Sequence, residues 1–130
     1  MKKMCPVVHF ELPATDSARM ADFYSNVFGW QTHIFGPEMG NYVTAATTEL
    51  DEYGMPKTPG AINGGFFPKQ ADQPNQCPSV VIAVDDIHTS MKEVTAAGGT
   101  ILAEPVLIPG VGLYAPFADT EGNKISLLQR

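Results

Sequence analysis

The feature that most constrains this chain is an internal repeat with an offset of 70 residues. The stretch from His9 to Trp30 matches the stretch from Ser79 to Thr100 in pattern more than in identity, with Asp16 corresponding to Asp86. A chain of 130 residues has the length of one domain. We therefore expect a single domain over residues 1–130, with modules at 6–67 and 79–129 joined by a linker at 68–78.

Each copy opens with a strand pattern. Val8, Phe10 and Leu12 alternate with Val7, His9 and Glu11, and in the second copy the residues Val80, Ile82 and Val84 alternate with Ser79, Val81 and Ala83. This period of two is typical of a strand with one buried and one more polar face.

A helix is predicted after each of these strands. Asp16 and Asp86 are suitable N-caps, and Gly98-Gly99 is a suitable end for the second helix. The buried stripe predicted for the first helix consists of Met20, Phe23, Tyr24, Val27 and Phe28. Further strands are predicted over 30–35, 42–49, 61–67, 100–107, 113–118 and 124–129, which gives the order βαβββ twice and an α+β fold.

Composition and charge exclude several classes of partner. The net charge of −6 disfavours nucleic acid and anionic membrane, since both are bound by clustered Lys and Arg. The N-terminal apolar stretch is short and is interrupted by Pro6, Glu11 and Pro13, so we expect no signal peptide or membrane span. Two cysteines are few for a disulfide-stapled secreted domain, which favours a cytoplasmic location.

The motifs of the chain resemble a known superfamily. The opening HFELP from His9, the segments Asp22-Phe23-Tyr24 and Phe28-Gly29-Trp30, and the closing FADTEGN from Phe117 resemble the vicinal oxygen chelate proteins. That superfamily includes glyoxalase I, bleomycin-resistance proteins and extradiol dioxygenases. Residues 61–67 and 109–112 look closest to its small bacterial members related to lactoylglutathione lyase.

The resemblance implies a fold and an assembly. Two βαβββ modules are expected to form a cupped eight-stranded mixed sheet, with a helix packed on the convex side of each module and a ligand pocket on the concave side. A homodimer is also expected.

The resemblance also implies four metal-ligand positions, and this chain fills them poorly. Carried over residue by residue, they fall on His9, Gly64, Ser79 and Ser126. A catalytic zinc needs about three protein ligands from His, Cys, Asp and Glu. We therefore predict no cofactor and no metal ligands, although a divalent metal held by His9 and Glu11 with water or substrate stays open.

His9 and Glu11 are the candidate catalytic residues, because they are two residues apart and so share a strand face. An imidazole beside a carboxylate suits removal of a proton next to a carbonyl group. The alternative is a structural role, in which His9 satisfies backbone groups and Glu11 pairs with a cation. The predicted ligand-binding positions around the pair are Val7, Tyr42, Gly64, Phe66, Ser79, Val81, Tyr114, Ser126 and Leu128, with Tyr42 and Tyr114 either capping the opening or packing in the core. His33 and His88 are placed outside the pocket.

The favoured hypothesis is a metal-independent protein of glyoxalase-like type that binds a small organic molecule, either as a lyase or isomerase or as a carrier. One rival is a metal-dependent lyase acting on a thiol adduct, as in glyoxalase I. A second rival is a non-catalytic protein that sequesters a drug, and its acidic surface would attract a cationic one.

Overall fold

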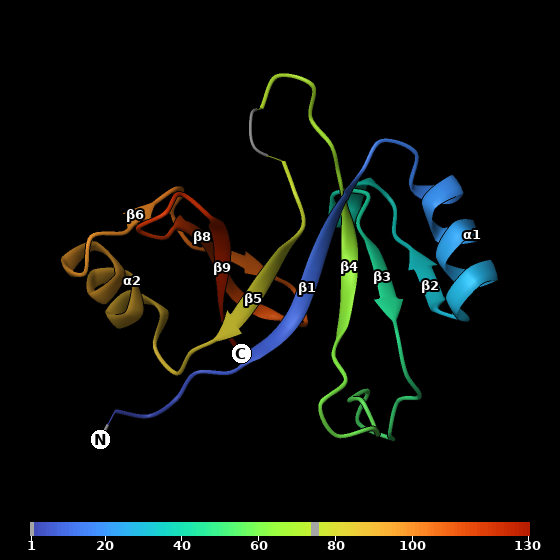
Figure 1. Ribbon diagram of the computed structural model, residues 1–130, viewed down its shortest axis with the longest axis horizontal. Helices are drawn as coiled ribbons and strands as arrows, with labels where there is room; N and C mark the ends of the chain where they lie inside the picture. Colours follow the sequence, from blue (N-terminus) through green and yellow to red (C-terminus); the bar gives the residue numbers. More distant parts are fainter. Residues whose placement is uncertain (1, 74–75) are drawn as a thin grey trace. The chain divides into compact units, whose positions relative to one another are not determined.

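The computed structural model describes residues 2–73 and 76–130, so residues 74 and 75 of the expected linker lie outside the described residues (Figure 1). The chain forms two compact units, which are described separately. The first unit is His9–Pro78, and the second combines the N-terminal segment up to Val8 with Ser79–Arg130.

In the residues that the structure describes, the first unit contains four strands and one α-helix. The strands are β1 (Val7–Ala14), β2 (Gln31–Ile34), β3 (Val43–Ala46) and β4 (Asn63–Pro68), in the sheet order β2-β3-β4-β1. β1 and β4 are parallel, whereas the other two pairs are antiparallel. A short 3-10 helix, η1 (Pro37–Met39), lies between β2 and β3.

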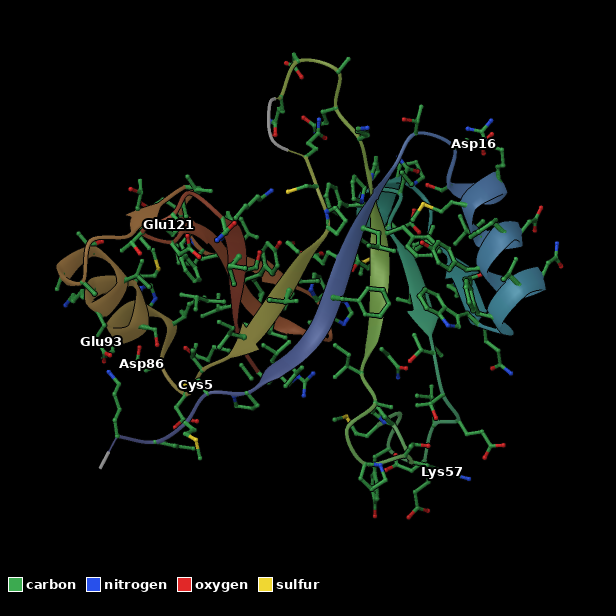
Figure 2. The ribbon with its side chains drawn as sticks, in the orientation of Figure 1. Cys5, Asp16, Lys57, Asp86, Glu93 and Glu121 are labelled. Atoms are coloured by element: carbon green, nitrogen blue, oxygen red, sulfur yellow. The ribbon has the colours of Figure 1, made fainter. Side chains whose placement is uncertain are left out.

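Helix α1 (Ser17–Phe28) begins at its predicted cap, Asp16. The carboxylate of Asp16, labelled in Figure 2, accepts a hydrogen bond from the Arg19 backbone N–H at 3.0 Å. Gly29 ends the helix with φ of 72°, a left-handed conformation that favours glycine. The predicted buried stripe is wrong in part. Phe23, Val27 and Phe28 are 54%, 57% and 61% exposed, and the helix instead buries Ala21.

The core of the first unit lies between α1 and one face of the sheet. Its buried members are Ala14, Ala21, Val43, Ala45 and Phe66, with Leu12, Met20, Tyr24 and Trp30 packed against them. A cluster of small side chains around one phenylalanine leaves little depth beneath the helix. The aromatic side chains on the outer side of α1, Phe23 and Phe28, consequently stay outside this core.

The second unit repeats the pattern with one more strand. It contains β5 (Ser79–Ala83), α2 (Ile87–Ala96), β6 (Thr100–Ile101), β7 (Val106–Ile108), β8 (Gly112–Ala118) and β9 (Lys124–Gln129), in the order β5-β9-β8-β6, with β7 also pairing with β8. The single strand predicted over 100–107 is therefore two strands. The break covers residues 102–105 and ends at Pro105, which has no backbone N–H to donate to a ladder.

Helix α2 starts at its predicted cap, because the Asp86 carboxylate accepts a hydrogen bond from the Thr89 backbone N–H at 3.2 Å (Figure 2). That bond is the main reason why the pKa of Asp86 is lowered. The helix covers a core of Ile87, Ala115, Phe117 and Leu127. Both units thus confirm the predicted α+β class, built from βαβββ modules in which a helix covers one sheet face.

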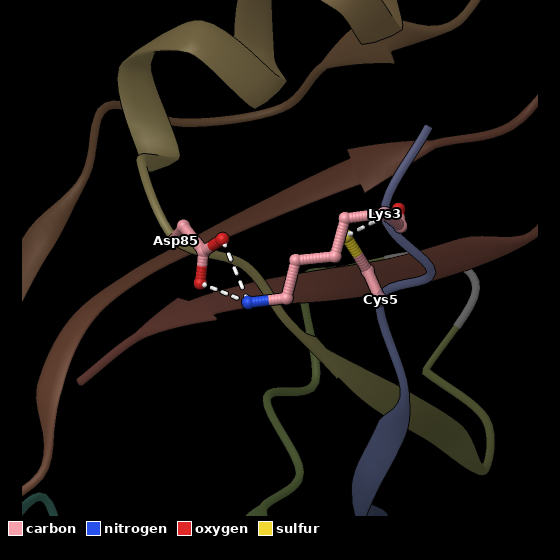
Figure 3. A network of polar contacts seen from close by, with 3 residues as sticks. All are labelled: Lys3, Cys5 and Asp85. Carbon is pink, nitrogen blue, oxygen red and sulfur yellow. Dashed lines mark hydrogen bonds and ion pairs between the residues drawn. The ribbon is translucent and has the colours of Figure 1, made fainter. Parts of the chain in front are cut away.

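The N-terminal segment belongs to the second unit. The Ala83 backbone N–H donates to the Pro6 carbonyl at 2.9 Å, and the Lys3 ammonium lies 3.1 and 2.9 Å from the two carboxylate oxygens of Asp85 (Figure 3). The hydrogen bond with Asp85 raises the pKa of Lys3 above its usual value. Lys2 also forms an ion pair with Glu93 of α2.

Candidate functional site

Strand β1 carries the two predicted catalytic side chains on one face. His9 and Glu11 alternate with Phe10 and Leu12, and Leu12 packs against the core on the α1 side. Glu11 is only 8% exposed, whereas His9 is half-buried. The face opposite α1, which carries His9 and Glu11, is called the polar face below.

Tyr42, directly before β3, joins these two side chains. Its hydroxyl lies 3.0 Å from His9 Nε2 and donates to Glu11 Oε2 at 3.3 Å. A tyrosine has one hydroxyl hydrogen, so a hydroxyl that donates to Glu11 accepts from His9, and Nε2 then carries a hydrogen. The direction of the chain is therefore His9 to Tyr42 to Glu11.

This arrangement brings together three groups that can each hold or release a proton. Glu11 is buried, while Tyr42 and His9 are half-buried, so the imidazole and the phenol are more accessible than the carboxylate. The sequence singled out Tyr42 only as a cap or a core residue. Its place between His9 and Glu11 depends on two contacts between residues that are far apart in the sequence, by 33 positions for His9 and by 31 for Glu11.

Two consecutive glycines of β4, Gly64 and Gly65, each leave room for an aromatic ring, one on each face of the sheet. The register sets Phe10 opposite Gly64 and Glu11 opposite Gly65. A Cβ atom added to Gly64 would lie 2.5 Å from the Phe10 ring, and one added to Gly65 would lie 2.1 Å from the Tyr42 hydroxyl oxygen. Gly65, not Gly64, therefore belongs to the polar face.

Two predicted ligand-binding positions are corrected by this register. Gly64 lies opposite Phe10, and Phe66 is fully buried in the core, packed against Tyr24 of α1 at a ring distance of 5.7 Å. Both are on the face opposite His9. Side chains alternate along a strand, so an error of one residue in aligning β4 with β1 moves every side chain to the other face.

The polar face also includes residues that the sequence left aside. Thr44 lies opposite Gly65 on one side and opposite His33 of β2 on the other. His33, placed outside the pocket from sequence, is thus an exposed residue of the same face, three strands from Glu11. Asn63 uses its side-chain oxygen to accept from the Thr47 backbone N–H at 2.9 Å.

The other predicted positions belong to the second unit. Val81 lies opposite Ser126, and Leu128 lies opposite Tyr114. The residues that alternate with them, such as Ile82 and Leu127, pack in the core with Ile87 of α2, so these four lie on the other face of their strands. Ser126 is fully buried and its hydroxyl is 2.7 Å from that of Tyr114. Ser79 begins β5 and is half-buried, and Val7 at the start of β1 is 44% exposed. The ligand pocket expected on the concave side of the sheet stays a prediction.

The residues at the family's metal positions do not fit a divalent cation. With the register corrected, the second position falls on Gly65 and still offers no ligand, while Ser79 and Ser126 offer hydroxyls and the Ser126 hydroxyl is engaged by Tyr114. Among the residues that the structure describes, no group of three or more His, Cys, Asp and Glu side chains could hold a metal. His9 and Glu11 alone fall short of the usual three ligands.

Comparison with known proteins identifies the family. The sequence profile of the glyoxalase/bleomycin resistance protein/dioxygenase superfamily matches residues 7–127. The chain belongs to this superfamily. The resemblance noted from the motifs is thereby confirmed.

Two superfamily relatives show how the chain compares in length. It is 32% identical over 123 residues to a glyoxylase-like domain-containing protein of Didymella fabae. The alignment covers 92% of this chain and 90% of that protein. It is also 32% identical over 133 residues to the anthracycline biosynthesis protein DnrV of Streptomyces peucetius, covering 93% of this chain. The match covers 46% of DnrV, so the chain spans about half the length of that relative.

Solved structures of the superfamily fold resemble the chain over almost its whole length. A methylmalonyl-CoA epimerase superposes with a TM-score of 0.70 at 19% identity, covering 99% of this chain and 98% of the other. The Streptomyces coelicolor methylmalonyl-CoA epimerase in complex with 2-nitronate-propionyl-CoA gives 0.71 at 14% identity, covering 98% and 95%. Identities this low show a shared fold. Among the described residues, no helix is long and apolar enough to cross a membrane.

Proposed function

We propose that the polar face of the first unit binds a small organic carbonyl compound and transfers a proton to or from the carbon next to its carbonyl group. The observation that supports this is the chain from His9 through Tyr42 to Glu11, with contacts of 3.0 and 3.3 Å. His9 and Tyr42 form the accessible end, and Glu11 forms the buried end. No resident metal takes part in the proposed reaction.

The proton balance of the step is simple. The C–H bond of the substrate breaks, its electron pair moves onto the carbonyl oxygen as an enolate, and the proton passes to the His9–Tyr42–Glu11 chain. Return of the proton to the same carbon on the opposite face epimerises the substrate, and return to a neighbouring atom isomerises it. No oxidant or reductant is needed. Groups positioned for such transfers typically contribute about 100- to 10,000-fold in rate.

The relatives support this class of chemistry without naming the substrate. Two structural neighbours are epimerases of methylmalonyl-CoA, a thioester, and one of them was solved with a propionyl-CoA derivative. A sequence relative takes part in anthracycline biosynthesis. Thioesters and polyketide-type diketones both carry acidic hydrogens beside carbonyl groups, so we take these two classes as the first substrates to test.

The proposal is tested by hydrogen exchange in heavy water. The protein is incubated with methylmalonyl-CoA and with a panel of simple thioesters, 1,3-diketones and hydroxyketones, and proton NMR follows loss of the signal at the carbon beside the carbonyl. We expect faster exchange than in buffer for at least one compound. Tyr42→Phe and Glu11→Gln should each slow that exchange about 100-fold or more, because each interrupts the chain.

The matched control is His88→Asn, which removes an exposed histidine at the start of α2 and should leave exchange unchanged. Exchange that is equal in wild type, Tyr42→Phe and Glu11→Gln would overturn the proposal. So would binding of panel compounds, detected by thermal shift, without exchange of any of them, and that result would favour the drug-sequestering rival. Loss of exchange after chelator treatment would restore the metal-dependent rival.

We also propose that the protein is a homodimer, as expected from the family resemblance. Light scattering at micromolar concentration should give twice the 14.0 kDa chain mass. A monomer mass would remove this part of the proposal.

A further inference from the structure

Gly65 lies on the polar face, and its missing side chain makes room for Tyr42. A Cβ atom at this position would lie 2.1 Å from the Tyr42 hydroxyl oxygen and 2.3 Å from two carbons of its ring. Contacts this short do not occur between real atoms, so any side chain at position 65 would displace the phenol. The displaced group is the one that lies between His9 and Glu11.

Backbone conformation does not explain the glycine. Gly65 lies inside β4 and its φ is outside the left-handed range, unlike that of Gly29 or Gly40. Glycine in the interior of a strand is unfavourable and often marks a close approach by another group. At Gly65 the approaching group is the Tyr42 phenol.

The second unit contains the same tyrosine in a different setting. Within the β1–β4 pair Glu11 lies opposite Gly65, and within the β5–β9 pair Val81 lies opposite Ser126, so Gly65 and Ser126 are equivalent positions of the repeat. Tyr114 pairs two residues beyond Ser126, and Tyr42, which precedes Val43, takes the corresponding place beyond Gly65. The two tyrosines are therefore equivalent as well.

The two modules differ in what each tyrosine hydroxyl meets. The Tyr114 hydroxyl lies 2.7 Å from that of Ser126, a fully buried residue. Gly65 has no side chain at the position equivalent to Ser126. The Tyr42 ring occupies that space, and its hydroxyl contacts His9 and Glu11. At position 81, which is equivalent to Glu11, the second unit has a valine and offers no carboxylate.

The geometry points to Gly65 as the positioning residue of the site, which holds the Tyr42 hydroxyl between His9 and Glu11 by having no side chain. This inference rests on the proposed function in that it concerns the same tyrosine. A methyl group at position 65 breaks the link between imidazole and carboxylate. A serine there repeats the arrangement of Ser126 and Tyr114 and draws the phenol away from the chain.

The test uses the nitrogen NMR signals of the His9 ring, which distinguish the two neutral tautomers. In the wild type we expect the form with hydrogen on Nε2, because Tyr42 donates to Glu11 and must accept from His9. Gly65→Ala and Tyr42→Ala should both replace this single form with a mixture. Gly65→Ala should also slow exchange of an active panel compound by the same factor as Tyr42→Phe, within about threefold.

The decisive variant is the double substitution Gly65→Ala with Tyr42→Ala. If Gly65 acts only through Tyr42, the added methyl has nothing to displace once the ring is gone, so the double variant should match Tyr42→Ala in His9 tautomer and in thermal stability. The comparison also works if Gly65→Ala alone is too unstable to study. Recovery of folding when the Tyr42 ring is removed as well would show that the added methyl group acts through that ring.

Gly64→Ala is the matched control on the same strand, because its methyl meets the Phe10 ring on the opposite face. It should leave the His9 tautomer as in the wild type. A His9 signal unchanged by Gly65→Ala, or a further loss in the double variant beyond Tyr42→Ala, would overturn the inference. Absence of exchange with every panel compound, together with the expected tautomer changes, would instead remove the proposed function and leave Gly65 as the positioning residue.

Discussion

Truncating Phe66 to alanine should be among the most damaging single changes in the first unit. The ring is fully buried, among Ala14, Ala21, Val43 and Ala45. Because these neighbours are small and belong to the sheet and α1, they cannot collapse into the space that the ring leaves. Removing a buried phenylalanine ring costs about 3–5 kcal/mol, a large share of the roughly 5–15 kcal/mol that stabilises a typical domain.

The assay is urea unfolding followed by fluorescence of Trp30, the single tryptophan. Trp30 packs against the same core and stacks on Tyr24 at a ring distance of 4.5 Å, so its signal reports the first unit. For a slope of about 2 kcal/mol per molar urea, a loss of about 4 kcal/mol lowers the midpoint by about 2 M. A midpoint unchanged within error would refute the placement of Phe66 in the core.

Phe23→Ala is the matched comparison, since Phe23 is 54% exposed on the outer side of α1. Alanine has the higher helix propensity by about 0.5 kcal/mol, which offsets part of the lost contact with Tyr24 and Phe28. We expect a change within about 1 kcal/mol. A loss as large as that of Phe66→Ala would show that the outer face of α1 is covered in solution.

Three further predictions concern caps, pH and metal. Asp16→Ala should destabilise the first unit by about 1 kcal/mol in urea unfolding, whereas Asp16→Asn, which keeps an acceptor for the Arg19 N–H, should stay near wild type. Hydrogen bonds from the side chain and backbone of Asn123, and from the Glu121 backbone, lower the pKa of Asp119 below its usual 3.8. The Asp119 carboxylate therefore contributes fully to stability above pH 3.8, and this contribution is lost as the pH falls through the lowered pKa of the folded state. Asp119→Ala should therefore lower the urea midpoint at pH 6 and lower it progressively less below pH 3.8; an equal loss at both would contradict the assignment. Chelator treatment should leave hydrogen exchange of an active carbonyl compound intact, and metal analysis of the purified protein should give well under one zinc, nickel or iron per chain, with one tightly held metal per chain as the contrary result.

Local chemistry was sufficient to predict the helix caps and most strands. Asp16 and Asp86 cap their helices as expected, because a short carboxylate two or three residues before the first free backbone N–H groups satisfies them without help from the rest of the chain. The strand predicted over 124–129 matches β9 at both ends. The strand predicted over 100–107 is interrupted over residues 102–105, a stretch that ends in Pro105, which has no backbone N–H to donate.

The candidate site shows the same division. Alternation along β1 puts His9 and Glu11 on one face, and in the second copy Val81 and Ser126 lie opposite one another. The assignment of Gly64 and Phe66 to the polar face is wrong, because the register between two strands some 50 residues apart is not encoded in either strand alone. His33, which the sequence placed outside the pocket, is exposed on the same face.

By itself, the sequence determines the repeat, the strand and helix order, the two caps and the family, because these depend on neighbours along the chain or on motifs shared with relatives. Only the tertiary structure decides which face each β4 residue occupies, which side of α1 is buried, and that Tyr42 links His9 to Glu11. These features depend on register and packing depth, which arise when strands distant in sequence pair and a helix packs on them. Gly65 combines the two levels: the glycine is visible in the sequence, but the phenol that it accommodates is visible only in the fold.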